Sequence, residues 1–248
     1  MNDLVPFGSR RVSPVEKRRL VQDHFDTVAP RYDLTNTLLS FGLQHVWKRT
    51  AVNLLRLAPG ERVADVCGGT ADLAMLAAPA VLPGGHLVVY DFNRAMMALG
   101  QDKVRKAGLA RSIAFVQGDA EQLALPGRAF DAAMVGFGIR NLSNMEEGLR
   151  EMHRVLKPGG RLMILEFSKP TNPWFRALYD LYSFSVMPLM GKIMVNSWEA
   201  YTYLPESIRL FPSPEELSDR LRGLGFARVT YRPLSNGIAV THLAHKGS

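Results

Sequence analysis

The sequence predicts an α/β fold built on a mostly parallel seven-stranded sheet, and three observations lead to this prediction. From residue 60 onward, short apolar segments alternate with helical ones, as in sheets whose strands are buried on both faces. The tail carries two strand-like segments around Ser235-Asn236-Gly237, which favours a tight hairpin turn. Between these parts lies an aromatic-rich segment, residues 170–212, that is too long for a simple loop. We therefore expect a doubly wound sheet that ends in an antiparallel hairpin and carries a helical insertion.

The chain divides into three predicted parts. Residues 1–19 are basic and interrupted by proline, which predicts a flexible leader. Residues 20–58 show helical apolar spacing around a polar turn near Ala29-Pro30-Arg31, which predicts a helical lid. Residues 59–248 form the main domain, with the insertion at about 170–212. The strands of this domain are predicted at 62–67, 86–90, 113–117, 129–135, 161–166, 227–233 and 238–244, and its helices at 72–78, 94–106, 145–156 and 214–223.

Composition excludes several classes of protein. Apolar residues make up 47% of the 248 residues and charged residues 21%, which excludes a wholly disordered or fibrous chain. The longest apolar stretches stop near ten residues, so we expect no membrane-spanning helix, which needs roughly 20. Cys67 is the single cysteine, and no cluster of Cys and His suggests a metal site. These features predict a protein of the reducing cytoplasm, without a secretory signal, a disulfide or a metal.

The net charge is strongly positive, at +7, from 30 Lys and Arg against 23 Asp and Glu. Such a surface is compatible with simple solvation, with an anionic membrane surface, or with nucleic acid. No helix-turn-helix, RNP or zinc-finger pattern accompanies the basic residues, so we expect no nucleic-acid partner. Solvation and peripheral membrane contact both remain open.

Polar side chains follow three successive predicted strands. The first strand leads into Asp65-Val66-Cys67-Gly68-Gly69-Thr70-Ala71-Asp72, a small-residue turn that lets a ligand approach the backbone. Asp91 follows the second strand, where an acid can accept both hydroxyl protons of a ribose. Asp119 and Ala120 follow the third, where a carboxylate can accept from an adenine amino group. Each feature alone is also explained by a tight turn or a helix cap, but together they predict a nucleoside site.

This combination resembles the class I S-adenosylmethionine-dependent methyltransferases, and longer strings narrow the resemblance. Residues 32–47, YDLTNTLLSFGLQHVW, and 154–168, RVLKPGGRLMILEFS, resemble the two signatures of the quinone-biosynthesis C-methyltransferases. The segment GFGIRN at 136–141 and the segment EAYTYLPESI at 199–208 resemble two further parts of that family. The resemblance runs from about Val21 to the C-terminus. It implies a Rossmann-like fold and transfer of a methyl group from S-adenosylmethionine to a ring carbon of a prenylated quinol.

The resemblance also implies roles for individual residues. The expected cofactor-binding residues are Thr70, Asp91, Asp119 and Ala120, with Asp65, Gly69, Gly136 and Tyr32 beside them. Arg140 and Asn141 are the expected catalytic residues, with Arg140 stabilising a developing oxyanion. Arg140 could instead form a salt bridge at the end of a strand. Tyr32 and Asp33 are expected to cover the cofactor as a lid, or else to cap a helix. Glu166 remains open between a base and a structural acceptor.

The sequence departs from the family pattern at four positions. Ala71 replaces the usual last glycine of the turn, which the fold tolerates if φ stays negative. Gln44 and Thr35 replace a histidine and a methionine of the first signature, and Gly136 stands where relatives often have serine. The effect of Ala71, Gln44 and Gly136 on cofactor affinity is left open.

The insertion is expected to supply a groove for the prenyl tail, although its aromatic residues could instead pack on the sheet or in a homodimer. The residues expected in the groove are Trp174, Phe175, Leu178, Tyr179, Tyr182, Phe184 and Met187. Together with the basic surface, such a groove favours a peripheral enzyme at the inner face of the membrane. Two alternatives are a methyltransferase acting on another small molecule or tRNA, and a non-catalytic scaffold. The choice between naphthoquinol and benzoquinol, the tail length, the oligomeric state and the general base are not predicted.

Overall fold

The computed structural model describes residues 4–186, 188–189 and 198–248. Its main sheet has seven strands in the order β5-β4-β3-β6-β7-β9-β8, with only β9 and β8 antiparallel to their neighbours. The predicted mostly parallel sheet with a terminal hairpin is therefore confirmed. The strands are β3 Arg62–Val66, β4 His86–Asp91, β5 Ile113–Gln117, β6 Phe130–Gly136, β7 Leu156–Phe167, β8 Phe226–Leu234 and β9 Ala239–Lys246.

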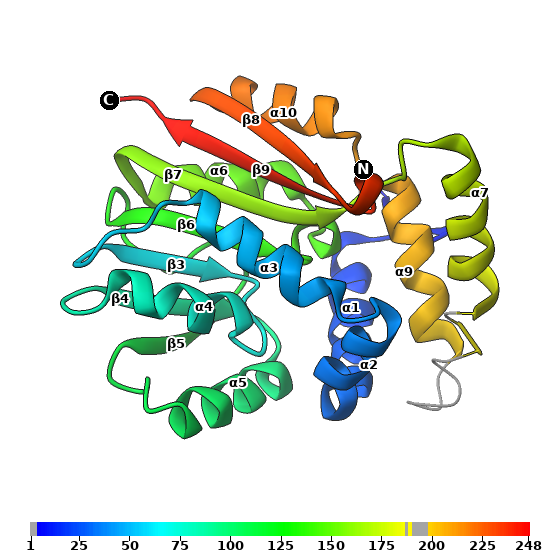
Figure 1. Cartoon of the computed structure of the whole chain (residues 1–248), viewed down its shortest axis with the longest axis horizontal. Coiled ribbons are helices and arrows are strands. Elements are labelled where there is room, and N and C mark those ends of the chain that lie inside the picture. The colour runs from blue at the N-terminus through cyan, green and yellow to red at the C-terminus, as the bar shows by residue number, and fades with distance from the viewer. Residues whose placement is uncertain (1–3, 187, 190–197) are drawn as a thin grey trace.

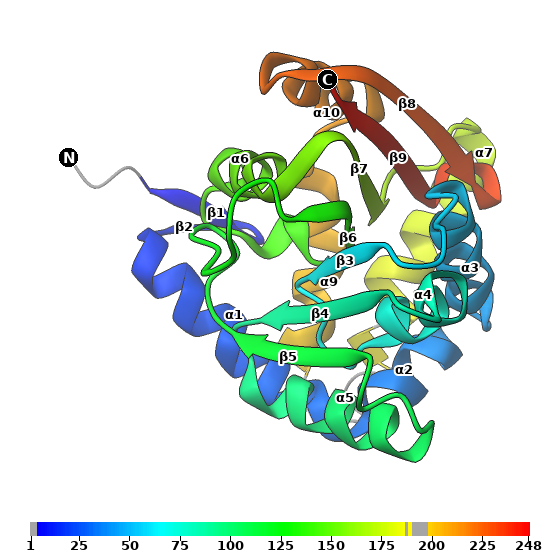
Figure 2. The same ribbon diagram turned by 90° about the vertical axis from the view of Figure 1, so that its left-hand side faces the viewer.

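Helices cover both faces of the sheet, as Figures 1 and 2 show. Residues of α3 (Leu43–Leu54), α4 (Asp72–Val81) and α5 (Arg94–Lys106) join the apolar core on one face. Residues of α6 (Met145–Val155) and α10 (Pro214–Gly223) join the core on the other. Burial of both faces explains why the central strands are continuous apolar segments.

The remaining helices gather at the end of the sheet where the parallel strands finish (Figure 1). They are α1 (Pro14–Val28), α2 (Tyr32–Leu39), α7 (Pro173–Leu181) and α9 (Trp198–Leu210), joined by the short turns η1 (Ala29–Arg31) and η3 (Tyr182–Val186). Ligands of open α/β sheets bind at this end. The fold therefore places the lid and the insertion over the expected site.

Residues 4–19, the described part of the expected flexible leader, contain regular elements. β1 (Val5–Phe7) and β2 (Arg10–Val12) pair antiparallel, and α1 starts at Pro14. The hydroxyl of Ser13 accepts from Glu16 N at 3.2 Å and so caps this helix. Phe7 stacks on Tyr203 of α9, with ring centroids 4.4 Å apart. The sequence shows the charge of this segment, whereas the contact that orders it lies almost two hundred residues away.

Three non-glycine residues with positive φ lie at the ends of two central strands. Cys67 follows β3 with φ 53° and Phe137 follows β6 with φ 59°. Ala71, which precedes α4, has φ 65°, so the condition that its φ stay negative is wrong. Non-glycine residues in this region carry a cost of about 1 kcal/mol or more and cluster at functional sites. Cys67, Ala71 and Phe137 therefore place strained backbone at the carboxyl edge of the sheet.

Among the described residues, no helix combines the length and the apolar character needed to cross a bilayer. The predicted hairpin turn is present as η4 (Ser235–Gly237), where Ser235, Asn236 and Gly237 all have positive φ. This geometry is the reason that the Asn-Gly pair predicts the turn.

Candidate active site

Two cavities lie next to each other at the carboxyl edge of the sheet. The first, the glycine-turn cavity, has a volume of about 370 Å³ and is lined by the turn after β3, by Asp91 and by Asp119. The second, the aromatic cavity, has a volume of about 430 Å³ and lies between the lid and the insertion. Phe25, Tyr32, Lys48, Phe137 and Asn141 line both cavities. The two cavities therefore share a wall made of these five side chains.

The glycine-turn cavity contains every residue predicted to bind the cofactor. Its lining includes Tyr32, Asp65, Gly69, Thr70, Asp91, Asp119, Ala120 and Gly136. The sequence therefore identified residues that the fold brings together from β3, β4, β5, β6 and the lid.

Asp91 is a buried carboxylate that supports the glycine turn. Its Oδ2 accepts from Gly69 N at 2.9 Å and its Oδ1 from Asn93 N at 2.8 Å. Burial raises the pKa of Asp91 to about 6, against the effect of these backbone donors. The side chain that caps α5 is that of Asn93, which accepts from Met96 N, so Asp91 does not serve as a helix cap. Each Asp91 oxygen keeps a lone pair for a ligand hydroxyl.

Asp119 is more exposed and is tied to the N-terminal helix. Its Oδ1 accepts from Glu121 N at 2.9 Å, and Arg18 of α1 lies 3.7 Å from its Oδ2. Ala120 beside it is buried in the apolar core under the cavity. The pair forms one end of the cavity, at the tip of β5, with Asp91 at the tip of the neighbouring β4.

Asp65 is a fully buried carboxylate at the end of β3. Its Oδ2 accepts from Ala74 N at 3.0 Å in the first turn of α4, where Ala71 has no side chain that can cap. Its Oδ1 has no hydrogen-bond partner among the described residues. Burial, followed by the charges of Asp91 and Asp72, raises the pKa of Asp65 to about 8. The unpartnered Oδ1 is therefore the Asp65 atom left to interact with a polar group of a ligand, and a nearby positive charge would lower this pKa.

Replacement of Asp65 by asparagine should therefore change the pH dependence of stability. The pKa of Asp65 rises from its ordinary value of 3.8 to about 8 in the fold, so the folded state binds an extra proton between these pH values. Folding free energy contributed by Asp65 is present at low pH and is lost as pH rises toward 8, by at most about 1.4 kcal/mol per pH unit. We expect D65N, which keeps an acceptor for Ala74 N, to remove this slope in urea unfolding between pH 5 and 8. An unchanged slope would contradict the assignment.

The departures at Gly136 and Ala71 are accommodated locally. A Cβ built on Gly136 would lie 2.7 Å from Leu73 Cδ1, so a serine at this position would require the Leu73 side chain to move. Ala71 is fully buried, and its methyl group packs in the core of the α3–α4 face. Leu73 thus fills the space beside Gly136, and the core of this chain accommodates the methyl group of Ala71.

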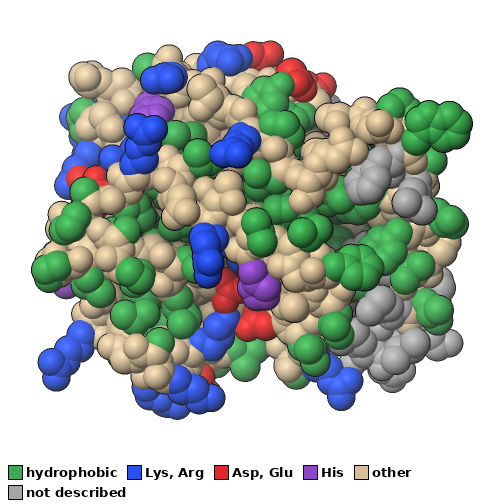
Figure 3. Space-filling model, in the orientation of Figure 1, with side chains coloured by type: hydrophobic (Ala, Val, Ile, Leu, Met, Phe, Trp, Pro, Cys, Tyr) green, Lys and Arg blue, Asp and Glu red, His purple; other side chains and the backbone are tan. Residues whose placement is uncertain are grey.

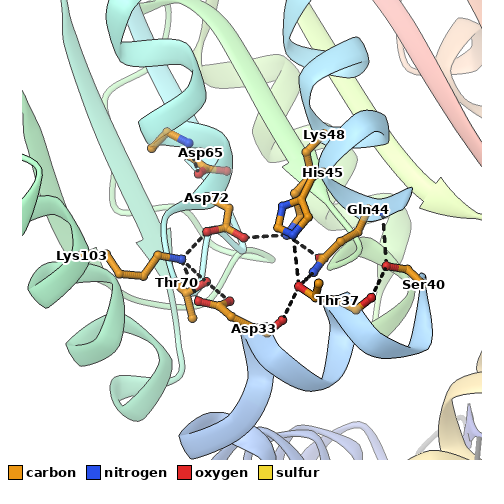
Figure 4. Close-up of polar contacts among 11 residues, drawn as sticks. Asp33, Thr37, Ser40, Gln44, His45, Lys48, Asp65, Thr70, Asp72 and Lys103 are labelled. Carbon is orange, nitrogen blue, oxygen red and sulfur yellow. Dashed lines mark hydrogen bonds and ion pairs between the residues drawn. The ribbon is translucent and has the colours of Figure 1, made fainter. Parts of the chain in front are cut away.

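A charged network ties the lid to the glycine turn (Figure 4). Asp33 of α2 accepts from Thr70 Oγ1 at 3.1 Å and from Lys103 Nζ at 2.9 Å. Lys103 also pairs with Asp72, and Lys48 of α3 lies 2.7 Å from the other oxygen of Asp72. The hydroxyl of Thr70 therefore points toward the lid. Sequence reasoning missed Lys48 and Lys103 because no spacing rule connects helices so far apart in the chain.

Gln44 belongs to the same network. Its Nε2 donates to Thr37 Oγ1 at 2.9 Å, and its Oε1 accepts from Lys48 Nζ at 2.9 Å. His45 Nε2 lies 3.1 Å from the same Thr37 hydroxyl. Gln44 lines the aromatic cavity and His45 does not. The Gln44 amide thus links Thr37 to Lys48, because its NH2 group donates to Thr37 and its oxygen accepts from Lys48.

Arg140 and Glu166 form a buried ion pair at the polar end of the aromatic cavity. Arg140 Nη1 donates to Glu166 Oε2 at 2.9 Å and to the Phe137 carbonyl at 2.6 Å. The side chains are 10% and 2% exposed. Arg140 Nε has no hydrogen-bond partner among the described residues. Arg140 thus makes the strand-end salt bridge that was its alternative, and it still keeps an unused donor.

Glu166 is held on all sides by donors. Besides Arg140, the N–H of Phe167 donates to its Oε2 at 3.1 Å. Burial raises the pKa of Glu166, and Arg140 opposes this shift. The two oxygens are used within the protein, which favours the structural acceptor over the base. Glu166 is also absent from the lining of both cavities.

Sequence reasoning missed three polar residues of the aromatic cavity: His24, Tyr203 and Lys48. The hydroxyl of Tyr203 donates to Asn141 Oδ1 at 3.0 Å. The ring of His24 lies 5.5 Å from that of Tyr203. Burial, and then the charge of Arg140, lowers the pKa of His24 to about 4, so its imidazole is neutral at pH 7. Apolar spacing alone marks His24 only as a residue of an amphipathic helix.

The aromatic residues predicted to form a groove separate into two groups. Tyr179 and Tyr182 line the aromatic cavity, and Tyr182 donates to the Leu39 carbonyl at 2.9 Å. Trp174 is 88% exposed and does not line it. The side chains of Phe175, Leu178 and Phe184, and residue Met187, lie outside the described part of the structure.

Within the described part of the chain, no three His, Cys, Asp or Glu side chains lie together as they would around a metal ion. The site is therefore described by its carboxylates, its glycine turn and the neighbouring aromatic cavity.

Comparison with known proteins decides the family. The sequence pattern of the ubiE/COQ5 methyltransferase family matches residues 13–246. The chain belongs to this family. It is 46% identical over 236 residues, 95% of this chain and 92% of the relative, to "Ubiquinone/menaquinone biosynthesis C-methyltransferase UbiE" of Ectopseudomonas mendocina. The protein of the same name from Pseudomonas fluorescens SBW25 is 45% identical over the same shares of both chains. As a ubiE/COQ5 family member, the chain is an S-adenosylmethionine-dependent methyltransferase.

Solved structures confirm the fold of this ubiE/COQ5 family member. A SAM-dependent methyltransferase from Aquifex aeolicus aligns with a TM-score of 0.57 at 20% identity, over 80% of this chain and 88% of that one. The [4+2]-cyclase SpnF aligns with a TM-score of 0.68 at 18% identity, over 92% and 95%. One of these two proteins is a methyltransferase and the other a cyclase, so the fold alone does not fix the activity.

Proposed function

We propose that this protein methylates a ring carbon of a prenylated quinol and releases S-adenosylhomocysteine. The observation that carries the proposal is the wall shared by the two cavities at Tyr32, Phe137 and Asn141. One cavity has the carboxylates and small residues that a nucleoside needs, and the other is an aromatic pocket with a polar end. Reacting atoms must approach to about 3–3.5 Å, which adjacent cavities permit.

The residues of the glycine-turn cavity fit S-adenosylmethionine. Asp91 would accept from the ribose hydroxyls, Asp119 and Ala120 would flank the adenine, and the orphaned Oδ1 of Asp65 would face cationic groups. Gly69, Thr70, Gly136 and Tyr32 would complete the wall. When bound, the cofactor supplies a methyl group on a positively charged sulfur. The protein's residues bind and orient it.

Arg140 and Asn141 would act on the acceptor ring. The unused Nε of Arg140 can donate to a ring oxygen and stabilise negative charge that develops there as the carbon becomes nucleophilic. Asn141 lines both cavities and is held by Tyr203, so it would position the ring against the shared wall. Since arginine stays protonated, the proton leaves through another group or through water.

Mass spectrometry of the quinone pool in cells that lack the gene tests this function. We expect a quinone lighter by one methyl group to accumulate, and its ring system identifies the acceptor as a naphthoquinol, a benzoquinol or both. Return of the normal pool on expression of the wild-type chain, but not of D91N, links the change to this site. An unchanged pool, with salt-sensitive tRNA binding and tRNA methylation instead, would favour the tRNA alternative.

We also propose that the protein contacts the inner face of the membrane through the mouth of the aromatic cavity. Phe41, at the turn between α2 and α3, is 79% exposed and lies 5.8 Å from the ring of Tyr182. Leu34 and Leu38 of α2 and Trp174 and Leu181 of α7 are also exposed. Figure 3 shows apolar side chains over the end of the molecule formed by the lid and the insertion. A prenylated substrate would enter from the bilayer at this point.

Phe41→Asn tests the membrane proposal without adding a charge. Phe41 has φ 50°, a conformation that asparagine adopts readily, so the turn should be retained. Removing one inserted aromatic ring should weaken association with phosphatidylglycerol vesicles by about 10- to 100-fold in flotation assays. Leu99→Asn on α5, where the side chain is 36% exposed, is the matched control and should have no effect. Equal losses in both variants would contradict a docking role for the lid turn.

A further inference from the structure

The hydrogen-bond donors and acceptors at one end of the aromatic cavity bear on the redox state of the ring that is methylated. Four polar side chains lie at this end: His24, Arg140, Asn141 and Tyr203. The remaining lining is mainly apolar or aromatic, with Asn36, Ser40, Gln44 and Lys48 as further polar side chains, and Asn141 also reaches the glycine-turn cavity. An acceptor ring at the shared wall can therefore place an oxygen beside Asn141 and its partner Tyr203.

The proton of the Tyr203 hydroxyl is already used. It is donated to Asn141 Oδ1 at 3.0 Å, and Tyr203 is only 7% exposed. Burial raises the pKa of Tyr203 to about 12, so the hydroxyl keeps its proton at physiological pH. The oxygen of Tyr203 can then only accept a further hydrogen bond.

The position of Tyr203 is fixed from both sides. Phe7 of the N-terminal hairpin stacks on its ring at 4.4 Å, and His24 of α1 lies 5.5 Å away. Glu206 of the same helix accepts from Ser9 N at 2.8 Å and ties the hairpin to α9. The ordered hairpin thus keeps the hydroxyl in place, which gives the N-terminal segment a part in the site.

We infer that Tyr203, fixed by Asn141, selects the reduced quinol over the oxidised quinone. A quinol hydroxyl can donate to the Tyr203 oxygen, whereas a quinone carbonyl has only lone pairs to offer. To donate to a quinone, Tyr203 must release Asn141 Oδ1 and leave a buried acceptor without a partner. The second ring oxygen, quinol or quinone, can accept from Arg140 Nε, so Arg140 binds both forms.

His24 does not set the polarity. Its imidazole is neutral at pH 7, so one ring nitrogen donates and the other accepts, and it adds no positive charge beside Arg140. The inference rests on the proposed function, since it assigns a ring with two oxygens to the aromatic cavity.

Binding measurements with a matched pair of probes test the inference. The probes are 2-prenyl-1,4-naphthoquinone with one isoprene unit and the quinol obtained from it with dithionite, both under anaerobic conditions. Quenching of Trp47, which lines the aromatic cavity, reports binding. The wild-type protein should bind the quinol more tightly by about 5- to 100-fold, the cost of one unpaired buried acceptor. Equal affinity for the two forms overturns the inference, and failure of both to bind overturns the proposed function instead.

Tyr203→Phe should abolish the preference while it keeps the stacking with Phe7. Quinol affinity should fall and quinone affinity should stay the same or rise, since the Asn141 side chain, no longer held at Oδ1 by the Tyr203 hydroxyl, can turn and present its Nδ2 to a carbonyl. Tyr182→Phe is the matched control: Tyr182 lines the same cavity, but its hydroxyl donates to the Leu39 carbonyl. The preference should survive in Tyr182→Phe, and S-adenosylhomocysteine affinity should be unchanged in both variants. Loss of the preference in both, or in neither, would contradict the role of Tyr203.

Discussion

Asp91→Asn should weaken the binding of S-adenosylhomocysteine by at least about 100-fold. The carboxylate would lose its ability to accept from two ribose hydroxyls, and hydrogen bonds to a charged group contribute about 1.5–3 kcal/mol each. The new amide would also place an N–H group against Gly69 N or Asn93 N, both of which now donate to Asp91. The glycine turn would therefore shift as well.

Calorimetry measures this effect, and its pH dependence adds a second test. Since burial raises the pKa of Asp91 to about 6, protonation below that pH removes acceptor capacity, and wild-type affinity should fall by up to tenfold per pH unit. D91N should lack this fall. Asp102→Asn on α5, where the carboxylate is exposed and pairs with Arg105, should bind as the wild type does. A loss below fivefold in D91N would leave Asp91 as a support of the turn only.

The sequence was sufficient to predict the sheet and to identify residues that line the glycine-turn cavity, because both depend on local rules. Each parallel strand is a short apolar segment, and the carboxyl ends of parallel strands meet at one edge. Asp65, Asp91 and Asp119 lie at or just after the ends of three strands, so the parallel arrangement alone brings them together. The glycine turn, too, is recognisable from adjacent residues.

The acceptor side could be predicted only in part, because it is assembled from distant segments. Arg140 and Asn141 follow β6 and were found by resemblance. Tyr203 becomes functional through contacts with Asn141 and Phe7, which lie 62 and almost two hundred positions away. A charged and proline-containing leader is usually mobile. Here the contacts of Phe7 and Ser9 with α9 hold the N-terminal segment in place. Long-range packing of this kind has no periodic signature in the sequence.

Arg140→Met should lower kcat by about 10²- to 10³-fold while S-adenosylhomocysteine affinity changes by less than about threefold. The expected loss is that of one donor to a developing oxyanion. Arg140 does not line the glycine-turn cavity, so cofactor binding should be spared. Steady-state kinetics with a short-chain quinol, beside calorimetry, separate the two effects. A larger loss in cofactor affinity than in kcat would place Arg140 in the cofactor wall.

The same substitution also threatens the fold, and a double variant distinguishes the two consequences. Removing Arg140 leaves Glu166, 2% exposed, without its ion-pair partner, which costs about 3–5 kcal/mol in buried pairs. Replacing both residues, as Arg140→Met with Glu166→Gln, leaves no buried charge and keeps an acceptor for Phe167 N. Stability in urea should therefore recover in the double variant, whereas kcat should remain as low as in Arg140→Met. Recovery of kcat together with stability would show that Arg140 supports the strand end and does not touch the acceptor.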